Sequence, residues 1–169
     1  TDENRFFRGM AINIGRGVFS CIGFTSVKQI DARLTDSISF STLYTSGIHA
    51  TPSQIANENS VQEQVYGLGF RYAGSRLQLG LNGIYQQYDR NKEESDRLSQ
   101  SYDFSGKSCA GVSFDYKYLA GKLQFFGEMA RSYNGYALLN GALFFLQAGT
   151  TIGMLHRYYQ PEYVACWSN

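Results

Sequence analysis

Five charged residues recur at positions where strand alternation would place them on one face of a sheet. They are Arg71, Asp115, Lys117, Glu128 and Arg157. Each lies in a segment in which apolar and polar residues alternate, and each belongs to the polar set. If such strands close into a barrel, mixed charges that face the interior form a network that closes it, or line a path that selects solutes. A purely structural network and simple solvation are the alternatives.

The sequence contains residue types that can support catalysis or bind a cofactor, but their spacing matches neither a catalytic motif nor a cofactor-binding motif. Ser105-Gly106-Lys107-Ser108 is like the end of a phosphate-binding loop, but Ser101 stands where that loop needs its first glycine. The histidines, His49 and His156, are far apart and lack metal-ligand spacing. We expect His49 in solvent and His156 near a belt of aromatic residues, each without the serine or aspartate partner of a barrel enzyme. The sequence therefore predicts no enzyme activity, no metal and no cofactor.

The three cysteines, Cys21, Cys109 and Cys166, form an odd set without a Cys-x-x-Cys spacing. Cys109 and Cys166 both fall near the long connections described below and could pair. Three free or buried thiols are nevertheless the arrangement that we expect.

Composition excludes several classes of protein. Fifteen Lys and Arg residues against fourteen Asp and Glu give a net charge of +1, so the chain lacks the basic surface of a nucleic-acid-binding protein. The longest apolar stretch, 137–146, is interrupted by Asn140 and Gly141 and is shorter than the roughly 18 residues of a spanning helix. Charged residues are 17% of the chain, below the roughly 25% of an ordinary soluble domain. An all-β chain rich in glycine and tyrosine is the class that remains.

Period-two alternation predicts about eight long strands. It is clearest at 76–88, where Leu77, Leu79 and Leu81 are separated by polar residues or glycine. The expected strands are 9–14, 18–28, 64–72, 76–88, 111–118, 122–132, 137–146 and 150–159. Several approach the roughly 9–11 residues that a tilted strand needs to cross a bilayer.

The connections between these strands alternate in length. Tight turns that contain glycine are expected at 15–17, 73–75, 120–121 and 147–149, and long polar connections at 29–61 and 89–103. An Asn134-Gly135 turn is the exception. Short turns on one rim and long loops on the other are typical of outer-membrane barrels. We therefore expect residues 1–169 to form a single all-β, antiparallel up-and-down transmembrane β-barrel, or a segment of one.

The connection 29–61 is expected to be an extracellular excursion with structure of its own. Alternation at 37–45 predicts an extended ribbon above the membrane rim. Thr51, Pro52 and Gln54 match the start of a capped helix over about 52–58, with an ordinary polar loop as the alternative. Residues 1–8 contain no signal-peptide core, and we expect the chain to be a segment of a longer one.

Alternation alone does not say which face meets water. The apolar face turns inward in a soluble barrel or sandwich, whereas it meets lipid in a membrane barrel. Three features favour lipid: few Lys and Glu residues on the polar faces, charges gathered in one long loop, and tyrosines near strand ends. The tyrosines are Tyr85, Tyr88, Tyr102, Tyr133, Tyr136, Tyr158 and Tyr159 on the long-loop side, and Tyr72, Tyr116 and Tyr118 on the short-turn side.

Several short motifs occur in an order that matches a known family. They are TLYTSGIHATPSQIA at 42–56, EQVYG at 63–67, YDFSG at 102–106, FFGE at 125–128, LLNG at 138–141 and LHRYY at 155–159. In these motifs the chain resembles an uncharacterised outer-membrane β-barrel family of Bacteroidota, whose longer members often carry an N-terminal helix-hairpin-helix segment. The resemblance covers 8–163 and implies an internal part of a bigger barrel. It supplies no substrate and no catalytic residue.

The expected function is that of an integral outer-membrane β-barrel with a porin-like, envelope-transport or assembly role and no catalytic activity. The expected location is the outer membrane of a Gram-negative cell. Outer-membrane lipid and other envelope proteins are the expected partners, and nucleic acid is not. The alternative is a soluble β-barrel that binds a small apolar ligand in its interior.

Overall fold

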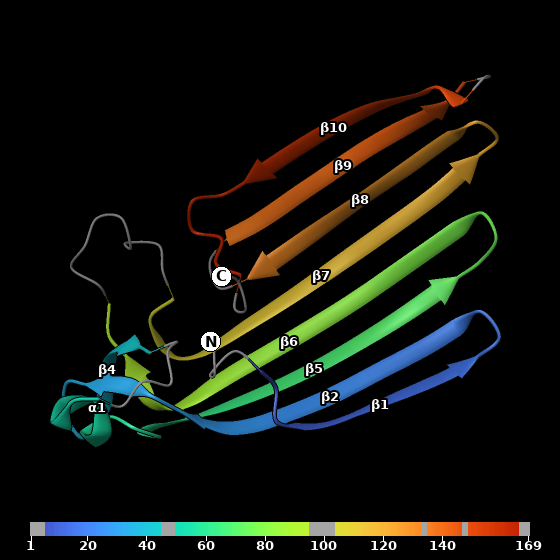
Figure 1. The fold of residues 1–169 in the computed structure, drawn as a ribbon. Coiled ribbons are helices and arrows are strands. Elements are labelled where there is room, and N and C mark those ends of the chain that lie inside the picture. Colours follow the sequence, from blue (N-terminus) through green and yellow to red (C-terminus); the bar gives the residue numbers. More distant parts are fainter. Residues whose placement is uncertain (1–5, 45–49, 95–103, 133–134, 147–148, 166–169) are drawn as a thin grey trace. The chain divides into compact units, whose positions relative to one another are not determined.

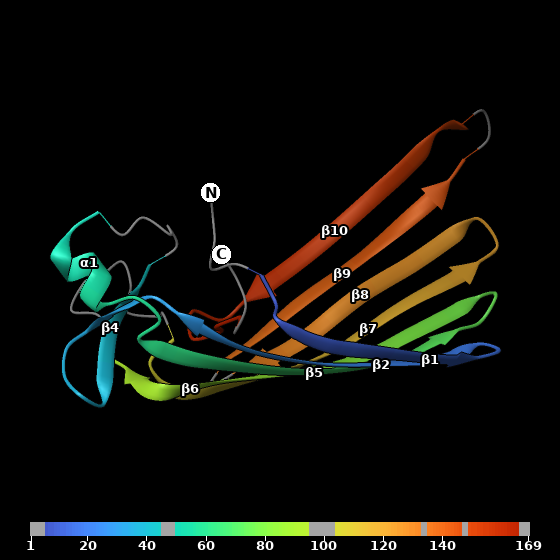
Figure 2. The same ribbon diagram turned by 60° about the horizontal axis from the view of Figure 1, so that its bottom comes forward.

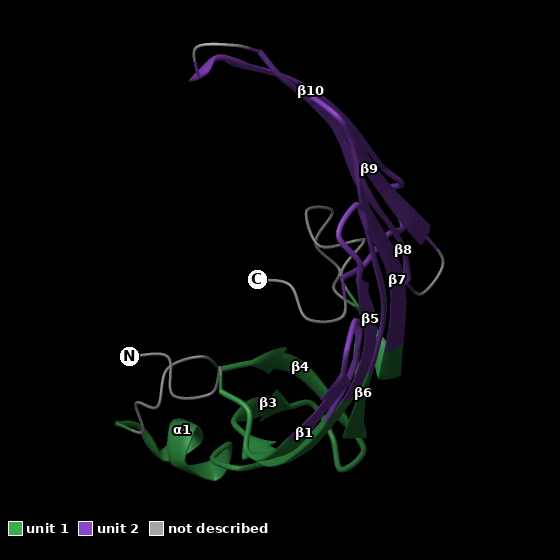
Figure 3. Ribbon diagram, turned by 90° about the vertical axis from the view of Figure 1, so that its right-hand side faces the viewer, with its two compact units in different colours: residues 1–11, 24–66, 85–109 green, residues 12–23, 67–84, 110–169 purple. Residues whose placement is uncertain are grey.

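The computed structural model describes residues 6–44, 50–94, 104–132, 135–146 and 149–165. The described residues fall into two compact units, coloured separately in Figure 3. Unit 1 takes its described residues from 1–11, 24–66 and 85–109, and unit 2 from 12–23, 67–84 and 110–169. Several strands continue from one unit into the other.

The described chain is nearly all antiparallel β-structure (Figures 1 and 2). Its elements are β1 (Gly9–Arg16), β2 (Phe19–Ile30), β3 (Ala32–Leu34), β4 (Ser39–Leu43), α1 (Pro52–Ala56), β5 (Val61–Ala73), β6 (Leu77–Lys92), β7 (Gly106–Ala120), β8 (Leu123–Ser132), β9 (Gly135–Phe145) and β10 (Thr151–Tyr159). The long strands pair in the order β1-β2-β5-β6-β7-β8-β9-β10. This is chain order once β3 and β4 are set aside.

The predicted fold class is confirmed. Each of the eight predicted strands corresponds to one long strand, and neighbours in the chain pair in an up-and-down order. Among the described residues the path of paired strands ends at β1 and β10 and does not close, as expected for a segment of a barrel. Several strands extend beyond the prediction at the long-loop end: β5 begins at Val61, β6 ends at Lys92 and β7 begins at Gly106.

Tight turns join β1 to β2, β5 to β6 and β7 to β8 (Figure 1). Gly17 and Gly121 have positive φ angles of 59° and 61°, a backbone conformation that glycine adopts without steric cost. The turns predicted at 15–17 and 120–121 are therefore confirmed. Residues 147–148, Tyr133 and Asn134 lie outside the described residues. So do residues 95–103, which include Tyr102 and make up most of the predicted connection 89–103.

The ribbon predicted in the excursion forms, but it is attached to the ends of the strands. β3 and β4 pair as an antiparallel hairpin, and β4 then pairs in parallel with β6, where Ser39 lies opposite Asn91. The N–H of Asn91 donates to the carbonyl of Ile38, and that of Glu93 to the carbonyl of Phe40. These bonds extend β6 into the connection that the sequence predicts from residue 89.

The turn between β3 and β4 is organised by Asp36. Its Oδ1 accepts hydrogen bonds from the N–H of Ile38 (2.8 Å) and from the N–H and hydroxyl of Ser39 (both 2.7 Å). The Ile38 N–H, followed by the Ser39 hydroxyl, holds the pKa of the Asp36 carboxyl below its usual value. The charged form of Asp36 therefore fixes the turn that returns the chain along β4.

Helix α1 begins where the sequence predicts. The Thr51 hydroxyl accepts from the N–H of Gln54 (3.3 Å), and Gln54 Oε1 accepts from the N–H of Thr51 (3.1 Å), which is a complete capping box. The helix ends at Ala56, and Asn57 Nδ2 donates to the carbonyl of Ser53 (2.9 Å).

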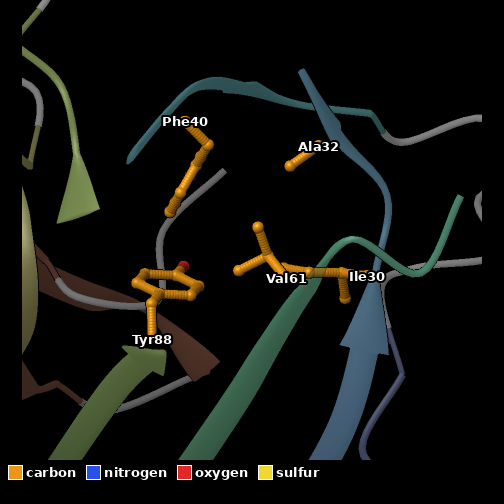
Figure 4. Close-up of a cluster of buried hydrophobic side chains, with 5 residues drawn as sticks. All are labelled: Ile30, Ala32, Phe40, Val61 and Tyr88. Atoms are coloured by element: carbon orange, nitrogen blue, oxygen red, sulfur yellow. The ribbon is translucent and has the colours of Figure 1, made fainter. Parts of the chain in front are cut away.

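A buried apolar cluster joins the ribbon to three strands of unit 1 (Figure 4). Phe40 of β4 packs with Ile30 of β2, Val61 of β5 and Tyr88 of β6, and Ala32 of β3 completes the group. The rings of Phe40 and Tyr88 meet edge to face with their centroids 5.4 Å apart. The prediction that Tyr88 lies in an aromatic belt with Tyr85 is therefore wrong. The two residues are three apart, so strand alternation places them on opposite faces.

Replacing the ring at the centre of this cluster tests whether it holds the ribbon. Phe40→Ala should cost about 3–5 kcal/mol, because it removes a fully buried ring from a packed site. Amide hydrogen exchange at Val61 and Val65 should then become faster. Ile38→Ala, two residues away on the same ribbon and exposed, is the control and should leave both amides protected. Equal effects of the two substitutions would contradict the assignment.

Candidate functional site

Strand β5 presents two chemically different faces. On β5, Leu68 and Phe70 are each 50% exposed, while Gly69 between them is buried. Below, "apolar face" means the side that carries Leu68 and Phe70, and "polar face" means the side that carries Gly69 and Arg71. In an antiparallel pair the side chains of directly opposed residues lie on the same side, so the registers of β7 to β10 extend both faces across those strands. Asp115 of β7 belongs to the polar face, because it contacts Arg71 of β5 and lies over Gly80 of β6.

Three of the predicted charged residues lie in one row across the polar face of unit 2. Asp115 of β7 is opposite Glu128 of β8, Glu128 is opposite Leu139 of β9, and Leu139 is opposite Arg157 of β10. Arg71 of β5 joins the row, with its Nη2 3.9 Å from Asp115 Oδ1.

Lys117 stands in the adjacent row of the same face, opposite Phe126. It is two residues from Asp115 along β7, and diagonal from Glu128. The structure thus brings all five predicted charged residues to one face of unit 2. Leucine, and not a charged partner, separates Arg157 from Glu128.

The charged row is not arranged as a stabilising network. The Arg71 side chain is 62% exposed, and ion pairs of that kind contribute about 1 kcal/mol or less. Asp115 and Glu128 are two carboxylates in direct opposition, which is unfavourable in a sheet. The row is therefore accessible to solvent and adds little to the stability of the fold.

Gly80 allows the Asp115 carboxylate to lie flat on the sheet. A Cβ at Gly80 would overlap that carboxylate. In the space that the glycine leaves, Asn82 Nδ2 donates to Asp115 Oδ2 (3.3 Å) and approaches Ser113 Oγ (3.5 Å). The polar face of β6 and β7 therefore offers glycine, amide, hydroxyl and carboxylate groups side by side.

The polar face changes character toward β10. On β5 to β7 it carries glycine, asparagine, serine and charged residues, as predicted. On β8 to β10 the registers place Phe126, Leu139, Leu143 and Leu155 on it. The polar face is therefore not uniformly polar on these strands. The alternation of β9 is weak because most of its residues are apolar on both sides.

A second polar cluster, which the sequence does not reveal as a unit, is buried in unit 1. Lys28 Nζ of β2 lies 3.2 Å from Glu63 Oε2 of β5, and both side chains are less than 5% exposed. Gln86 Nε2 of β6 is 2.7 Å from Glu63 Oε1 and 2.8 Å from the hydroxyl of Tyr88. Lys28 Nζ also donates to the carbonyl of Phe6 (3.0 Å). Glutamate and lysine are thus paired and hydrogen-bonded, as buried charges require.

The sequence signal for this cluster is weak, because its two charged residues lie at or just beyond the ends of predicted strands. Lys28 ends one predicted strand, and Glu63 precedes another by a single residue. Their pairing depends on β2 and β5 being neighbours across an excursion of more than thirty residues, which periodicity does not establish.

The cysteines differ from the expected arrangement. Cys109 is buried and disulfide-bonded, so the expectation of three free or buried thiols is wrong. Cys21 is free. Cys166 lies outside the described residues.

The remaining candidates for chemistry are dispersed. His156 lies on the apolar face of β10, opposite Asn140, and His49 lies outside the described residues. Lys107, from the stretch that is like a phosphate-binding loop, is exposed near the start of β7. Within the described ranges, no three His, Cys, Asp or Glu side chains are grouped so that they could hold a metal ion.

Comparison with known proteins leaves the chain without an assigned relative. No protein-family model, no curated protein and no solved structure matches it. In the part of the chain that the structure describes, no helix is long and apolar enough to cross a membrane.

The buried ion pair of unit 1 gives a stability prediction. Lys28→Met leaves the Glu63 carboxylate buried without its cation, and should lower the free energy of unfolding by about 3–5 kcal/mol. The double variant Lys28→Met with Glu63→Leu should recover most of that loss. Urea denaturation measures both, with Lys107→Met as the exposed control. A double variant no more stable than Lys28→Met alone would contradict the pairing.

Proposed function

We propose that this chain forms part of an integral outer-membrane β-barrel with a porin-like, envelope-transport or assembly role and no catalytic activity. In this proposal the apolar face meets acyl chains and the polar face is enclosed. The observation that carries it is the exposure of the apolar face. Leu68, Phe70 and Val112 are each 50% exposed, although side chains of this size normally form the core of a soluble protein.

The dimensions and order of the strands support the proposal. β5, β6 and β7 have 13, 16 and 15 residues, and β8 and β9 have 10 and 11, against the roughly 9–11 that cross a bilayer. Their short and long connections alternate in the manner of outer-membrane barrels.

Aromatic pairs on the apolar face also support a lipid environment. Tyr66 and Tyr85 have ring centroids 6.5 Å apart in unit 1, and Tyr136 and Tyr158 are 5.7 Å apart in unit 2. Near the short turns, Phe19 packs on Tyr72 (5.3 Å). Amphipathic rings at both ends of apolar strands are typical of the boundary between hydrocarbon and headgroups.

The ribbon and the disulfide are consistent with this placement. In unit 1 the ribbon packs on Val61 and Tyr88, which lie on the same strand faces as Glu63 and Gln86, so it covers the polar side and leaves the apolar side open. The disulfide at Cys109 favours an oxidising compartment, such as the periplasm or the cell surface.

The proposed partners are outer-membrane lipid and other envelope proteins. The resemblance to the Bacteroidota barrel family belongs to the same proposal. It fits a chain whose described strands do not close on themselves. In such a barrel, the row from Arg71 through Asp115 and Glu128 to Arg157 would lie in the interior.

A soluble β-barrel that binds a small apolar ligand is the second candidate. Phe126, Leu139, Leu143 and Leu155 on the polar face of β8 to β10 favour it, because they would offer such a ligand an apolar interior. The apolar face counts against it, since Phe70, Leu79, Leu81 and Phe114 line a groove of about 420 Å³ there that water would have to fill.

Extraction from native membranes separates the two candidates. The protein should stay in the membrane pellet after carbonate at alkaline pH and after high salt, and should require detergent for release, because acyl chains cover its apolar face. A known peripheral protein in the same membranes is the control. Release by carbonate without detergent would refute the membrane barrel.

The charged row gives a second prediction for the reconstituted protein. Glu128→Gln should shift the selectivity of single-channel conductance in planar bilayers toward anions. A unit charge about 7 Å from a permeating ion in water contributes roughly 0.6 kcal/mol to the energy of that ion. We therefore expect the selectivity to change by about two- to three-fold. Glu58→Gln, beside α1, should change nothing. Unchanged conductance and selectivity in Glu128→Gln would remove the row from the permeation path.

A further inference from the structure

A polar row crosses the apolar face of unit 2. Tyr116 of β7 is opposite Gly127 of β8, Gly127 is opposite Asn140 of β9, and Asn140 is opposite His156 of β10. The tyrosine hydroxyl lies 2.9 Å from Asn140 Oδ1, to which it donates. This bond passes over Gly127, where a Cβ would overlap both partners.

The rows on either side of this polar row are apolar. One contains Phe114, Met129, Leu138 and Tyr158, and the other contains Tyr118, Phe125, Ala142 and Met154. Beyond the second lie Ala120, Leu123, Phe144 and Ile152. The polar row is therefore bordered by apolar side chains in both directions along the strands, and does not belong to a rim.

The row retains hydrogen-bonding capacity that the described chain does not use. Asn140 Oδ1 already accepts the hydrogen bond from the Tyr116 hydroxyl, whereas the side-chain N–H groups of Asn140 have no partner among the described residues. His156 is exposed and forms no hydrogen bond within the same ranges. If the apolar face meets acyl chains, as the proposed function has it, each such group is unfavourable there, because hydrocarbon offers it no hydrogen-bond partner.

We propose that this row is the centre of an intramembrane interface with a second copy of the chain. Asparagine and histidine side chains both donate and accept hydrogen bonds, so the patch is complementary to itself. A two-fold interface presents the same patch from both sides, and places Asn140 and His156 of one copy against those of the other. Ala142, in the neighbouring row, has a short side chain, which permits the close approach that membrane interfaces use.

Cysteine crosslinking in native membranes tests the interface. In a Cys21→Ser background, Met154→Cys should form a dimer with a short bis-maleimide, because Met154 is 76% exposed in the row next to His156. Leu81→Cys is the control: it lies on the apolar face of β6, is 49% exposed, and should remain monomeric. Ile152→Cys, one row beyond Met154, is a second reporter for the same interface.

Removing the polar row distinguishes an interface from a lipid-facing surface. Adding Asn140→Leu and His156→Leu to Met154→Cys should reduce crosslinked dimer about tenfold, the effect of losing one or two hydrogen bonds within a membrane. Phe125→Leu, which alters an apolar row only, should leave crosslinking unchanged.

Three outcomes would overturn the proposal: no crosslink from either reporter, a product whose mass is that of a different partner, or a dimer that persists at full yield in the double leucine variant. Each variant is also extracted with carbonate. A monomer that resists extraction refutes the interface alone, whereas a protein that carbonate releases refutes the proposed function on which the interface rests.

Discussion

The exposure of one apolar face is the constraint on which the rest of the structure depends. Burying a large apolar side chain stabilises a folded protein by about 1.5–3 kcal/mol. A protein that folds in water normally obtains this stabilisation by packing such side chains together in a core. Here the buried apolar cluster is confined to the ribbon and the strand ends of unit 1, while Leu68, Phe70 and Val112 stay open. The proposed lipid environment accounts for this distribution, because acyl chains supply the burial that the chain itself does not.

The same strand alternation has different consequences in the two units. In unit 1 the ribbon covers the polar side of the strands, so Lys28 and Glu63 are shielded from solvent and form an ion pair. In unit 2 no such ribbon is described over that side, and the pair Arg71 and Asp115 remains accessible. The same alternation of apolar and polar residues thus gives a buried ion-pair network in unit 1 and a solvent-accessible row of charged residues in unit 2.

Much of the fold follows from local sequence rules. The eight long strands follow from period-two alternation, the start of α1 from the Thr51 to Gln54 capping box, and the shared face of Asp115 and Lys117 from their spacing of two. Features that depend on contacts between residues far apart in the chain do not follow from these local rules. The burial of Tyr88 requires Phe40 to return to β6, and the opposition of Asp115 to Glu128 requires the register of β7 and β8. Where both faces of a strand are apolar, as on β9, alternation carries little information.

Spin labels at adjacent positions of one strand test the central claim most directly. In a Cys21→Ser background, a nitroxide at Leu81→Cys should be accessible to oxygen, which concentrates in lipid, and protected from a water-soluble nickel reagent. A nitroxide at Asn82→Cys, on the opposite face of β6, should show the reverse preference in the same membranes. If the label at Leu81 prefers the nickel reagent, or if both labels respond alike, the apolar face does not meet acyl chains and the account is wrong.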